Sequence, residues 1–418
     1  MVTDILKIIC FVLGTVVSLA YAYQVVYLFV PLILRRRRDK NQAEQKRYAI
    51  LIAARNEEKV IGHLLDSIRQ QDYPAELLHT YVVADNCTDQ TAQVAKDHGA
   101  TVFVRNNKEQ VGKGYAVAWL LEQIKAEQGY DHFDAVVIFD ADNVLSLNYM
   151  TQLNKLAAQG YQVFSGYRNT KNFGTSWISA GHSLWYIHDS AHLNHSRMLL
   201  GSGCMVTGTG YGFTRELLER LGGWPFHSLT EDIEFSTWCA VHGIKIGYAH
   251  GAMLYDEQPN TMKTSWKQRT RWSQGGIQVS LAYFKEYFKG IGKGGWSAWT
   301  CFDAFTLSLW GYGTAGLCGF LTLLTAVLSG GILGLGIALV SALLGTYFSM
   351  LFIGGLTLLT EHKKIKATTG QKLMGLFTFP LYVATFLPVA IFSVFHKYEW
   401  NPIEHTEAVS IKELQEQK

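Results

Sequence analysis

A short apolar run that ends in two acids constrains the fold of this chain more than any other stretch. Val136–Phe139 is a row of four residues that favour β-structure, and Asp140 and Asp142 follow it with one small residue between them. Such a strand is typical of a parallel sheet buried on both faces, where ligand sites lie beyond the carboxyl ends of the strands. Mg²⁺ and Mn²⁺ prefer carboxylates together with substrate phosphates. The run therefore predicts a site for a metal and a diphosphate, with a plain strand-to-turn junction as the alternative.

The sequence around this run alternates between strand and helix patterns. The predicted strands are Tyr48–Ala53, Thr80–Ala84, Thr101–Arg105 and Ala135–Phe139, and the predicted helices are Val60–Gln71, Asp89–His98 and Gly114–Gln128. Such alternation predicts an α/β fold with a parallel sheet and right-handed crossover connections.

Polar loops follow the first two predicted strands at the edge where the two acids lie. The first loop is Ala54–Glu58 and the second is Asp85–Asp89. Thr88 or Asp89 is expected to cap the helix that follows, whereas Asp85 lies too early to cap it and is free for a ligand. Three strand ends therefore point to one cleft.

A glycine-rich turn around Lys113 resembles part of a phosphate-binding loop. In Val111–Gly114 the lysine stands between two glycines, but the upstream glycine of the P-loop pattern is missing. We therefore do not expect a P-loop NTPase. Near a helix start, Lys113 either meets a phosphate or is an ordinary solvated lysine.

Four histidines fall in one helical stretch. They are His182, His188, His192 and His195, and the second and third are spaced i, i+4. Zinc is disfavoured because no HExxH pattern surrounds them, and a polar helix that lines the cleft is the preferred interpretation. The glycine-rich segment 201–210 that follows is expected to let the backbone approach a ligand closely.

Two later motifs place acids and bases around the same cleft. Thr230-Glu231-Asp232 follows a Gly-Gly-Trp-Pro turn, and Gln268-Arg269-Thr270-Arg271-Trp272 comes after it. On a helix Gln268, Arg271 and Trp272 share one face. The guanidinium suits a diphosphate, and the ring offers a flat face to a sugar.

Part of the chain is expected to lie in a membrane, since 48% hydrophobic residues with 39 Gly and 11 Trp is rich for a purely soluble protein. Ile5–Leu34 is long enough to cross a hydrocarbon layer of about 30 Å and reads as an anchor, not a removed signal peptide. The basic run Arg35–Arg38 after it places the next domain in the cytoplasm, where nucleotide-activated substrates occur. A net charge of only +3 implies no nucleic-acid partner, and the six scattered cysteines are expected to be reduced.

The C-terminal part holds three further apolar stretches. Trp299–Leu328 and Ile332–Leu359 can each span a bilayer, and the basic stretch His362–Lys366 is expected on the inner side. Leu373–Phe395 contains two prolines, so it either crosses or forms a broken re-entrant or interfacial segment, and the number of crossings stays open. Gln278–Phe288 has the pattern of an amphipathic helix on the inner membrane face.

Four motifs in this order, flanked by membrane segments, resemble the membrane-embedded glycosyltransferases of family 2, which include cellulose, chitin, hyaluronan and poly-N-acetylglucosamine synthases. The motifs are Asp85, Asp140-Ala141-Asp142, Thr230-Glu231-Asp232 and Gln268-xx-Arg271-Trp272. The resemblance covers residues 48–280 closely. It departs at the second strand, where the family often has Asp-Asp-Gly or Asp-Gly-Ser and this chain has Ala84-Asp85-Asn86-Cys87, so the nucleotide is less firmly implied than the fold.

The resemblance implies a fold and a division of the chain. A GT-A-type, Rossmann-like α/β domain is expected in the cytoplasm at residues 46–275, held against a helical transmembrane bundle. The N-terminal anchor with its basic flank takes residues 1–38, interfacial helices and the C-terminal membrane region take 276–396, and a tail takes 397–418.

The resemblance also implies roles for single residues. Asp232 is the general base on the acceptor hydroxyl, and Asp140 and Asp142 hold the nucleotide and its Mg²⁺ or Mn²⁺, which acts as a Lewis acid. Trp272 stacks on the acceptor sugar, and Glu231 only positions it. The implied donor-binding residues besides the two metal-binding acids are Ala53, Arg55, Glu57, Asp85 at the uracil, Lys113, Gln268 and Arg271.

The implied activity is inverting transfer of glucose or N-acetylglucosamine from a UDP-sugar to a growing β-linked polysaccharide, which the protein secretes across the plasma membrane through its own channel. One alternative is a single transfer to a lipid, as in ceramide glucosyltransferases. Another is a transporter or receptor with a nucleotide-sensing domain, but Asp303 is the only acid in the candidate C-terminal spans. The sugar, the linkage, the oligomeric state and accessory subunits stay open.

The tail after the last apolar stretch is unusually aromatic. In the family a Trp-containing loop near this end of the membrane region closes over the donor, and residues 397–406 are similar in position. If they form a gating loop, Trp400 and His405 meet the diphosphate. The alternative is a solvated tail anchored by an interfacial Trp.

Overall fold

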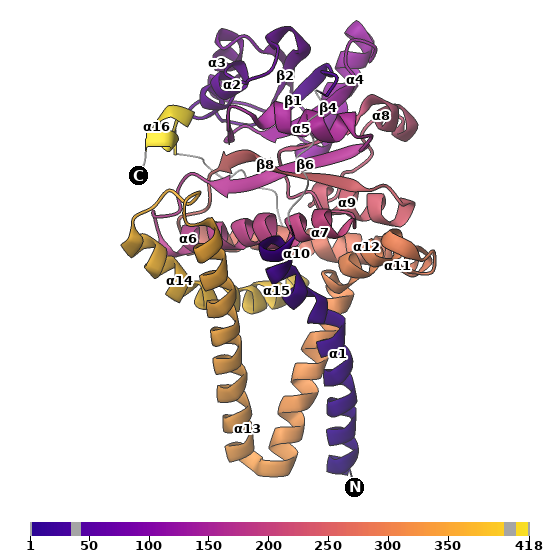
Figure 1. Cartoon of the computed structure of the whole chain (residues 1–418), viewed down its shortest axis with the longest axis vertical. Helices are drawn as coiled ribbons and strands as arrows, with labels where there is room; N and C mark the ends of the chain where they lie inside the picture. The colour runs from indigo at the N-terminus through magenta and orange to yellow at the C-terminus, as the bar shows by residue number, and fades with distance from the viewer. Residues whose placement is uncertain (1, 35–42, 397–406, 417–418) are drawn as a thin grey trace.

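An α/β domain stands on long helices in the computed structural model, which describes residues 2–34, 43–396 and 407–416 (Figure 1). The amino terminus lies at the far end of these helices, whereas the last described helix, α16 (Ile411–Glu416), lies beside the α/β domain. The predicted basic run Arg35–Arg38 lies outside the described residues.

One eight-stranded sheet with the order β3-β2-β1-β4-β7-β6-β8-β5 forms the centre of the domain. Its strands are β1 (Tyr48–Ala54), β2 (Leu78–Asp85), β3 (Thr101–Arg105), β4 (Ala135–Asp140), β5 (Val144–Leu145), β6 (Val163–Thr170), β7 (Tyr211–Thr214) and β8 (Ile246–Asp256). The first four strands are parallel, which confirms the predicted strands and the predicted parallel sheet. β7 runs against β4 and β6, and β6 is parallel to β8. The carboxyl ends of β2, β1, β4, β6 and β8 therefore share one edge.

The helices of the domain cross between these strands. They are α2 (Ile61–Arg69), α3 (Thr91–Asp97), α4 (Lys113–Gln128), α5 (Tyr149–Ala158), α8 (Arg215–Leu221) and α9 (Glu231–His242), with a short 3₁₀ turn at Ala75–Leu77. The three predicted helices are present with slightly shifted ends. Of the two candidate capping residues Asp89 acts at the start of α3, since its carboxylate accepts the N–H of Thr91 at 3.0 Å.

The acid-bearing strand is buried as the sequence predicts. Every residue of 135–139 in β4 is at most 1% exposed, because β1 covers one edge, β7 the other, and helices cover both faces. A strand so placed has only its end available to a ligand, and that end is Asp140.

A helical layer separates the sheet from the long helices. It consists of α6 (Trp177–His188), a π-helical turn η2 (Asp189–Asn194) and α7 (His195–Leu200). His182 contacts the Ser265 hydroxyl at 2.8 Å on the side of the site. His192, in contrast, bonds the Leu28 carbonyl at 3.0 Å, and His188 lies 3.4 Å from a threonine hydroxyl of α13. The prediction that this helix lines the cleft is therefore wrong for His188 and His192, which lie at the junction with the long helices.

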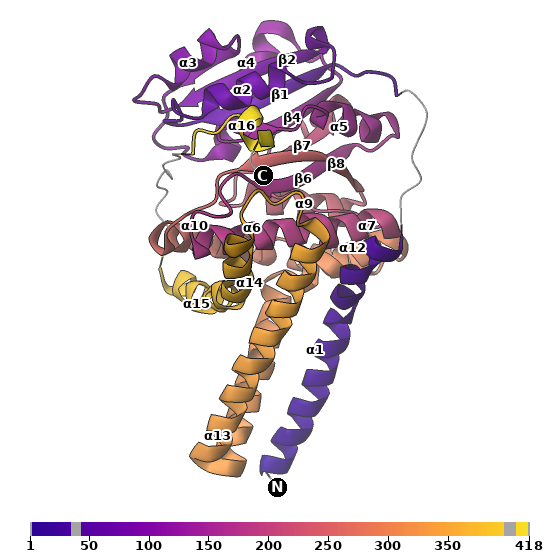
Figure 2. The ribbon, with the colours of Figure 1, turned by 60° about the vertical axis from the view of Figure 1, so that its left-hand side comes forward.

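Three described helices are long and apolar enough to cross a membrane. They are Thr3–Ile33 of α1 (Val2–Ile33), the 53-residue α13 (Leu309–Glu361), and Thr369–Phe395, which contains α14 (Thr369–Ala384) and α15 (Phe386–Phe395). Gly331 breaks α13 with φ 58° and ψ −145°, so its first arm leads away from the domain and its second arm returns (Figures 1 and 2). The predicted anchor and the two predicted spans on either side of Gly331 are thus present as long apolar helices.

The predicted boundaries of three segments need correction. The first C-terminal arm begins at Leu309 and not at Trp299, because residues Gly295–Thr306 form a separate helix, α12, that packs on α9. The predicted amphipathic helix Gln278–Phe288 is divided at Tyr283 between α10 (Met262–Ala282) and α11 (Phe284–Ile291). Leu373–Phe395 is broken at Thr385, as one of the two alternatives expected.

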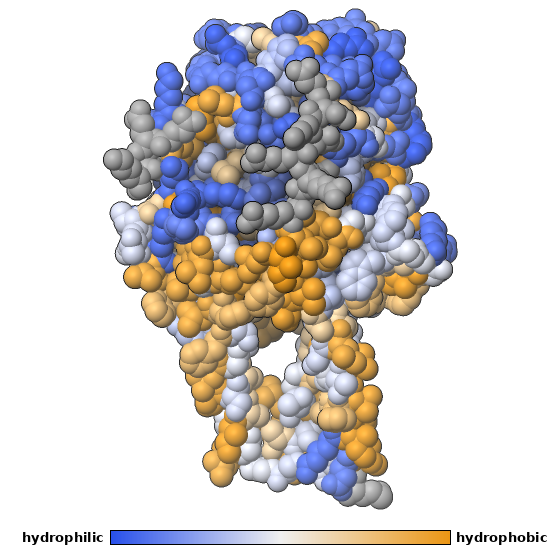
Figure 3. Space-filling view, in the orientation of Figure 1, coloured by the Kyte–Doolittle hydropathy of each residue, from blue (hydrophilic) through white to orange (hydrophobic). Residues whose placement is uncertain are grey.

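Helices α14 and α15 lie beneath the α/β domain (Figure 2), and α14 also packs against the second arm of α13, where the Tyr347 hydroxyl donates to the Phe377 carbonyl at 3.2 Å. Tyr382 of α14 packs so closely on α6 that a Cβ at Gly181 would lie 2.3 Å from its ring. Trp266 of α10 meets Phe392 of α15 with ring centroids 5.7 Å apart. Figure 3 shows hydrophobic surface over the lower rim of the domain and the long helices, below a hydrophilic upper part. The pair therefore forms an apolar floor under the domain.

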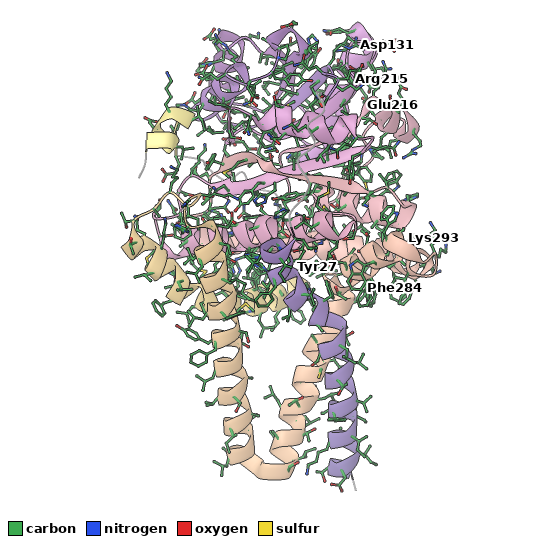
Figure 4. The ribbon with its side chains drawn as sticks, in the orientation of Figure 1. Tyr27, Asp131, Arg215, Glu216, Phe284 and Lys293 are labelled. Carbon is green, nitrogen blue, oxygen red and sulfur yellow. The ribbon has the colours of Figure 1, made fainter. Side chains whose placement is uncertain are left out.

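Buried polar contacts join α1 and α12 to the domain. Arg197 of α7 donates from Nε to Asp303 of α12 at 2.7 Å, and both side chains are 1% exposed. Trp299 donates from its ring nitrogen to the Tyr27 hydroxyl at 2.8 Å. Figure 4 shows Tyr27 where α1 reaches the domain, and Phe284 and Lys293 on the flanking α11 segment. These contacts fix how the domain stands on its helices.

The chain returns to the α/β domain at its C-terminal end. Ile411 and Leu414 of α16 are buried against Val144, and the backbone N–H of Glu407 donates to the Glu257 carboxylate at 3.0 Å. The tail therefore docks beside the end of β8.

Candidate active site

The carboxyl ends of β4 and β1 hold the first two candidate residues opposite each other. Asp140 pairs in register with Ala53, and the loop Asp140–Asn143 turns back immediately. The backbone N–H of Asp140 is bound by the Thr209 hydroxyl at 2.9 Å. The acids are therefore held at a fixed point of the sheet edge.

Lys113 joins this loop to the rest of the site. Its Nζ donates to Asp140 Oδ1 and to the Gly208 carbonyl, each at 2.6 Å, and its side chain is only 19% exposed. Burial lowers the pKa of Lys113, but the carboxylates of Asp140, Glu231 and Asp232 outweigh it, and the net pKa is raised. The interpretation of Lys113 as an ordinary solvated lysine is wrong.

The glycines around Lys113 explain why the turn has this form. Gly112 adopts φ 132°, which side-chain-bearing residues rarely adopt. A Cβ at Gly114 would lie 2.3 Å from the Phe226 carbonyl oxygen, so only glycine lets the start of α4 approach the loop that precedes α9. The turn therefore serves packing as well as the placement of Lys113.

Asp142 is 4% exposed and is oriented from both sides. Its Oδ1 accepts from the Asn143 amide at 3.2 Å, and its Oδ2 accepts from the backbone N–H of Glu257 at 2.9 Å. In the described part of the chain no three His, Cys, Asp or Glu side chains are grouped to hold a metal by themselves. Asp140 and Asp142 supply hard oxygen donors from one turn, which suits an ion that also takes substrate oxygens.

Glu231 and Asp232 begin α9 and face Lys113. Burial raises the pKa of Glu231 to about 7, although Lys113 lowers it, and the neighbouring Asp232 raises it further. Burial also raises the pKa of Asp232, against the lowering effects of the Ile233 N–H and of Arg271. The pair is therefore able to take up a proton near neutral pH.

Helix α10 brings the last motif against this pair. Arg271 donates to the Leu229 carbonyl at 2.9 Å, just before Glu231. Gln268 Oε1 is buried and has no hydrogen-bond partner among the described residues. Trp272 packs edge-on against His182 and Tyr186, with ring centroids 5.7 and 6.0 Å away. The prediction that these three side chains share one helix is confirmed, since α10 spans them without a break.

Asp85 is not free, contrary to the prediction. It is 5% exposed, and its Oδ1 accepts from the Arg105 guanidinium at 2.7 Å. Arg105 ends β3, so the pair joins two neighbouring strand ends. The contact of Asp85 with the uracil of the donor therefore remains a prediction, and the structure adds Arg105 as the partner of Asp85.

Arg55 and Glu57 lie on the loop that follows β1. The backbone N–H of Glu57 donates to the Thr91 hydroxyl at 2.7 Å, which joins the loop to α3. The Nε and Nη1 atoms of Arg55 are buried. Trp400 and His405 lie outside the described residues, so the gating loop remains a prediction.

The sequence patterns did not indicate Arg168 and Asp256, whereas Thr207–Thr209 falls in the glycine-rich segment 201–210 that the sequence predicts to approach a ligand. Arg168 donates to Asp256 Oδ2 at 2.6 Å, and burial raises the pKa of Asp256 to about 6 although Arg168 lowers it. The glycine-rich pattern of 201–210 was the one signal, since it indicated close backbone approach. Asp256 ends β8, which runs parallel to β6, so it lies at the same sheet edge as the other strand-end acids.

Comparison with protein families gives a match over most of the α/β domain. A family model described as "Glycosyltransferase like family 2" matches residues 45–275. Curated relatives include the probable glycosyltransferase YdaM of Bacillus subtilis (strain 168), 26% identical over 60% of this chain and 60% of that protein. The beta-monoglucosyldiacylglycerol synthase of Synechocystis sp. is 26% identical over 59% of this chain and 51% of its own length. The poly-beta-1,6-N-acetyl-D-glucosamine synthase of Staphylococcus aureus (strain COL) is 26% identical over 60% of each.

These relatives are matched over only part of their length, since the chain spans 50 to 60% of them. Among solved structures, a mannosyltransferase from Pyrobaculum calidifontis in complex with GDP-Man and Mn²⁺ aligns with a TM-score of 0.56 and 20% identity, over 93% of this chain and 99% of that one. At this identity the alignment shows a shared fold. The predicted GT-A, Rossmann-like fold with long apolar helices is thus confirmed.

Proposed function

Because the chain belongs to glycosyltransferase family 2, we propose that it transfers a hexose from a UDP-sugar to an acceptor hydroxyl at the sheet edge where Asp140 and Asp232 lie around Lys113. One observation carries this proposal. Lys113 bonds Asp140 and the Gly208 carbonyl, and, against the lowering effect of burial, the carboxylates of Asp140, Glu231 and Asp232 raise its pKa. Lys113 therefore ties the residues suited to the donor to those suited to a base.

The proposed reaction is a single inverting displacement. Asp232 takes the proton of the acceptor hydroxyl as its oxygen attacks the anomeric carbon, the bond from that carbon to the diphosphate breaks, and UDP leaves. An α-linked donor then gives a β-linked product. Gln268, through the N–H groups of its side-chain amide, and Arg271, through its guanidinium, hold the diphosphate, and Trp272 stacks on the acceptor.

A divalent metal fits the acid turn. Asp140 and Asp142 would hold Mg²⁺ or Mn²⁺ together with diphosphate oxygens, and the ion would neutralise charge on the leaving UDP. Lys113 adds a fixed positive charge beside Asp140. Asp142 is already oriented by the Glu257 N–H, which keeps one carboxylate oxygen in place.

We propose UDP as the nucleotide for two reasons. The motif order resembles that of synthases that use UDP-sugars. In addition, Asp85 is held at the end of β2, where the uracil of the donor would lie. The Arg105 pair fixes the direction of the Asp85 carboxylate. Ala53, Arg55 and Glu57 would complete the nucleotide side from the neighbouring strand end.

We propose that the acceptor is membrane-borne and that the α/β domain faces the cytoplasm at the plasma membrane. The first candidate is a growing β-linked polysaccharide that leaves through the membrane helices, with an accessory subunit as an optional partner. A membrane lipid is the second candidate, and one observation favours it. Within the described ranges α14 and α15 lie as an apolar floor beneath the domain, against α10, which carries Trp272. The helices that extend away from the domain are then α1 and the two arms of α13, which are few to enclose a polysaccharide channel.

Product analysis tests these proposals. Membranes that contain the protein are supplied with radiolabelled UDP-glucose or UDP-N-acetylglucosamine, and the label is sorted by gel into polymer and by solvent into lipid. High-mass label supports the polysaccharide, and low-mass, lipid-extractable label supports the lipid. Label that stays on the nucleotide with every UDP-sugar would reject the transfer itself.

A further inference from the structure

Arg168 lies at the carboxyl end of β6 and is held by two neighbours. Its Nε donates to Asp256 Oδ2 at 2.6 Å, and a second guanidinium nitrogen also contacts this carboxylate. The Cζ atom of Arg168 lies over the Tyr186 ring, 3.7 Å from the ring centroid. Such a clamp leaves the guanidinium little freedom, and the planar fork of arginine suits it better than the point charge of lysine.

Three consecutive backbone residues, Thr207–Thr209, connect this guanidinium to the rest of the site. The Thr207 carbonyl accepts from Nη1 of Arg168. The next carbonyl, that of Gly208, accepts from Lys113 at 2.6 Å, and the Thr209 hydroxyl binds the N–H of Asp140 at 2.9 Å. Each residue of the segment therefore bonds a different part of the site.

Gly208 places this segment directly beside the proposed base. Its φ is 87°, which glycine adopts without strain. A Cβ built there would lie 3.5 Å from Arg168 Nη1 and 3.5 Å from Asp232 Oδ2. The Arg168 guanidinium and the Asp232 carboxylate thus both lie beside Gly208.

We propose that Arg168 is a positioning residue that, clamped by Asp256 and Tyr186, holds Thr207–Thr209 against Asp232 and places a fixed positive charge beside that carboxylate. The proposal rests on the proposed function, because it assumes that Asp232 is the base. Arg168 touches neither the donor nor the acceptor in this scheme. It acts through the segment and through its charge.

The charges around Asp232 agree with this role. Burial raises the pKa of Asp232, and the three cations Arg271, Lys113 and Arg168 lower it. Each of these cations also has another partner at the site, Leu229 for Arg271, Asp140 for Lys113 and Asp256 for Arg168. Glu231 is the acid next to Asp232 and opposes these cations. Removal of the Arg168 charge should therefore shift Asp232 toward its protonated form.

The test compares Arg168→Gln and Arg168→Lys in the full-length protein in detergent or membranes. For Arg168→Gln we expect kcat to fall by about 10- to 100-fold, because Thr207–Thr209 and Asp232 are then no longer held in the reactive position. UDP affinity should change by less than about threefold. The acid limb of kcat/KM should move to higher pH, since Asp232 then protonates more easily. Arg168→Lys keeps the charge but not the fork, so kcat should fall with the acid limb unchanged.

A second buried pair provides the matched control. Arg197→Gln removes an equally buried guanidinium from Asp303, away from the site. It should lower the unfolding temperature and leave the acid limb in place. Arg168→Lys is the variant to rely on if Arg168→Gln does not fold.

Three outcomes separate the claims. If wild type transfers sugar and Asp232→Asn is inactive, but Arg168→Gln has the wild-type kcat and pH profile, the positioning role is wrong and the proposed function stands. If Arg168→Lys also loses UDP affinity in proportion to its loss of kcat, Arg168 is a structural residue only. Activity retained by Asp232→Asn would instead reject the proposed base, whatever Arg168 does.

Discussion

At the scale of single residues, the site is built from acids whose charge is only partly balanced. Glu231 and Asp232 are adjacent, half-buried or buried, and share the same cation, Lys113. Two interacting carboxylates lose their protons in steps that belong to the pair. The pair therefore sets how activity depends on pH.

We expect kcat/KM to fall as the pH is lowered through the titration of this pair. The base must be ionised, and burial raises both pKa values above those of exposed acids, about 3.9 for Asp and 4.3 for Glu. Protonation therefore sets in early, with Glu231 at about 7. Initial rates between about pH 5 and pH 9 test this. Glu231→Gln should remove the upper step, and a wild-type profile that is flat down to about pH 5 would contradict the account.

Asp142→Ala should abolish the effect of metal on UDP binding. Loss of an outer-shell partner already costs about 10- to 100-fold in metal affinity, so loss of a ligand should cost at least as much. UDP titration with Mn²⁺ and with chelator measures it. Asp97→Ala, an exposed acid on α3, is the control and should behave as wild type. If wild type bound UDP equally well with and without metal, Asp140 and Asp142 would be part of a plain strand-to-turn junction and not metal ligands.

The strand-end acids were predictable because strand periodicity and a following polar residue lie next to each other in the sequence. Asp140, Asp142 and Lys113 could be found without long-range information. Whether Lys113 is solvated or paired, in contrast, depends on contacts with residues that are distant in the sequence. The Asp85–Arg105 pair and the Arg168–Asp256 pair join different strands, so no local pattern indicates them. Their discovery requires the order of strands in the sheet.

At the scale of elements, helix α10 holds the parts of the site together. Its Gly275 lies against Thr230, directly before Glu231, so the approach of two helices depends on the absence of one Cβ. Arg269, which is fully buried, donates to the Thr385 hydroxyl at 2.6 Å and holds the break between α14 and α15 beneath the same helix. One helix therefore connects the base to the apolar floor.

Gly275→Ala should slow transfer, because its Cβ would lie 2.4 Å from Thr230 Oγ1. A misplacement of about 1 Å can cost about 100-fold in rate, so we expect a loss of at least about 10-fold in kcat. Gly276→Ala is the control on the next residue, where a Cβ would meet nothing within 4 Å. Equal activities of the two variants would show that this contact does not position the pair.

Element types were predictable from periodicity, but several ends were not. The break at Thr385 and the separate α12 depend on partners that are distant in sequence, namely Arg269 and α9. The long apolar runs indicated helices correctly, yet the hairpin in α13 becomes certain only through the dihedral angles of Gly331.

At the scale of the whole molecule, the helices divide the protein into two ends. The N-terminus and the turn at Gly331 lie at the end far from the α/β domain, and α16 lies beside the domain. In the described part of the chain this arrangement corresponds to α1 plus a returning hairpin. The tail is thus expected on the same side as the α/β domain, which is the cytoplasmic side under the proposed function, as a gating loop would also require.

Cysteine labelling tests this arrangement in a variant whose six native cysteines are replaced. Ser329→Cys, near the exposed hairpin turn, should react with an impermeant reagent in intact cells. Lys412→Cys, on the exposed side of α16, should react only in inverted vesicles. Reaction of Lys412→Cys from outside would require an odd number of C-terminal crossings and would eliminate a gating role for Trp400.

The most direct test of the central claim compares wild type with Asp232→Asn for UDP release across a panel of UDP-sugars and for UDP binding. We predict that wild type releases UDP from at least one donor, that the variant loses at least about 100-fold of this activity, since general bases contribute about 10²- to 10⁴-fold, and that UDP affinity stays nearly the same. A variant that keeps more than a few per cent of wild-type activity, or a wild type that releases UDP from no donor, would contradict the account.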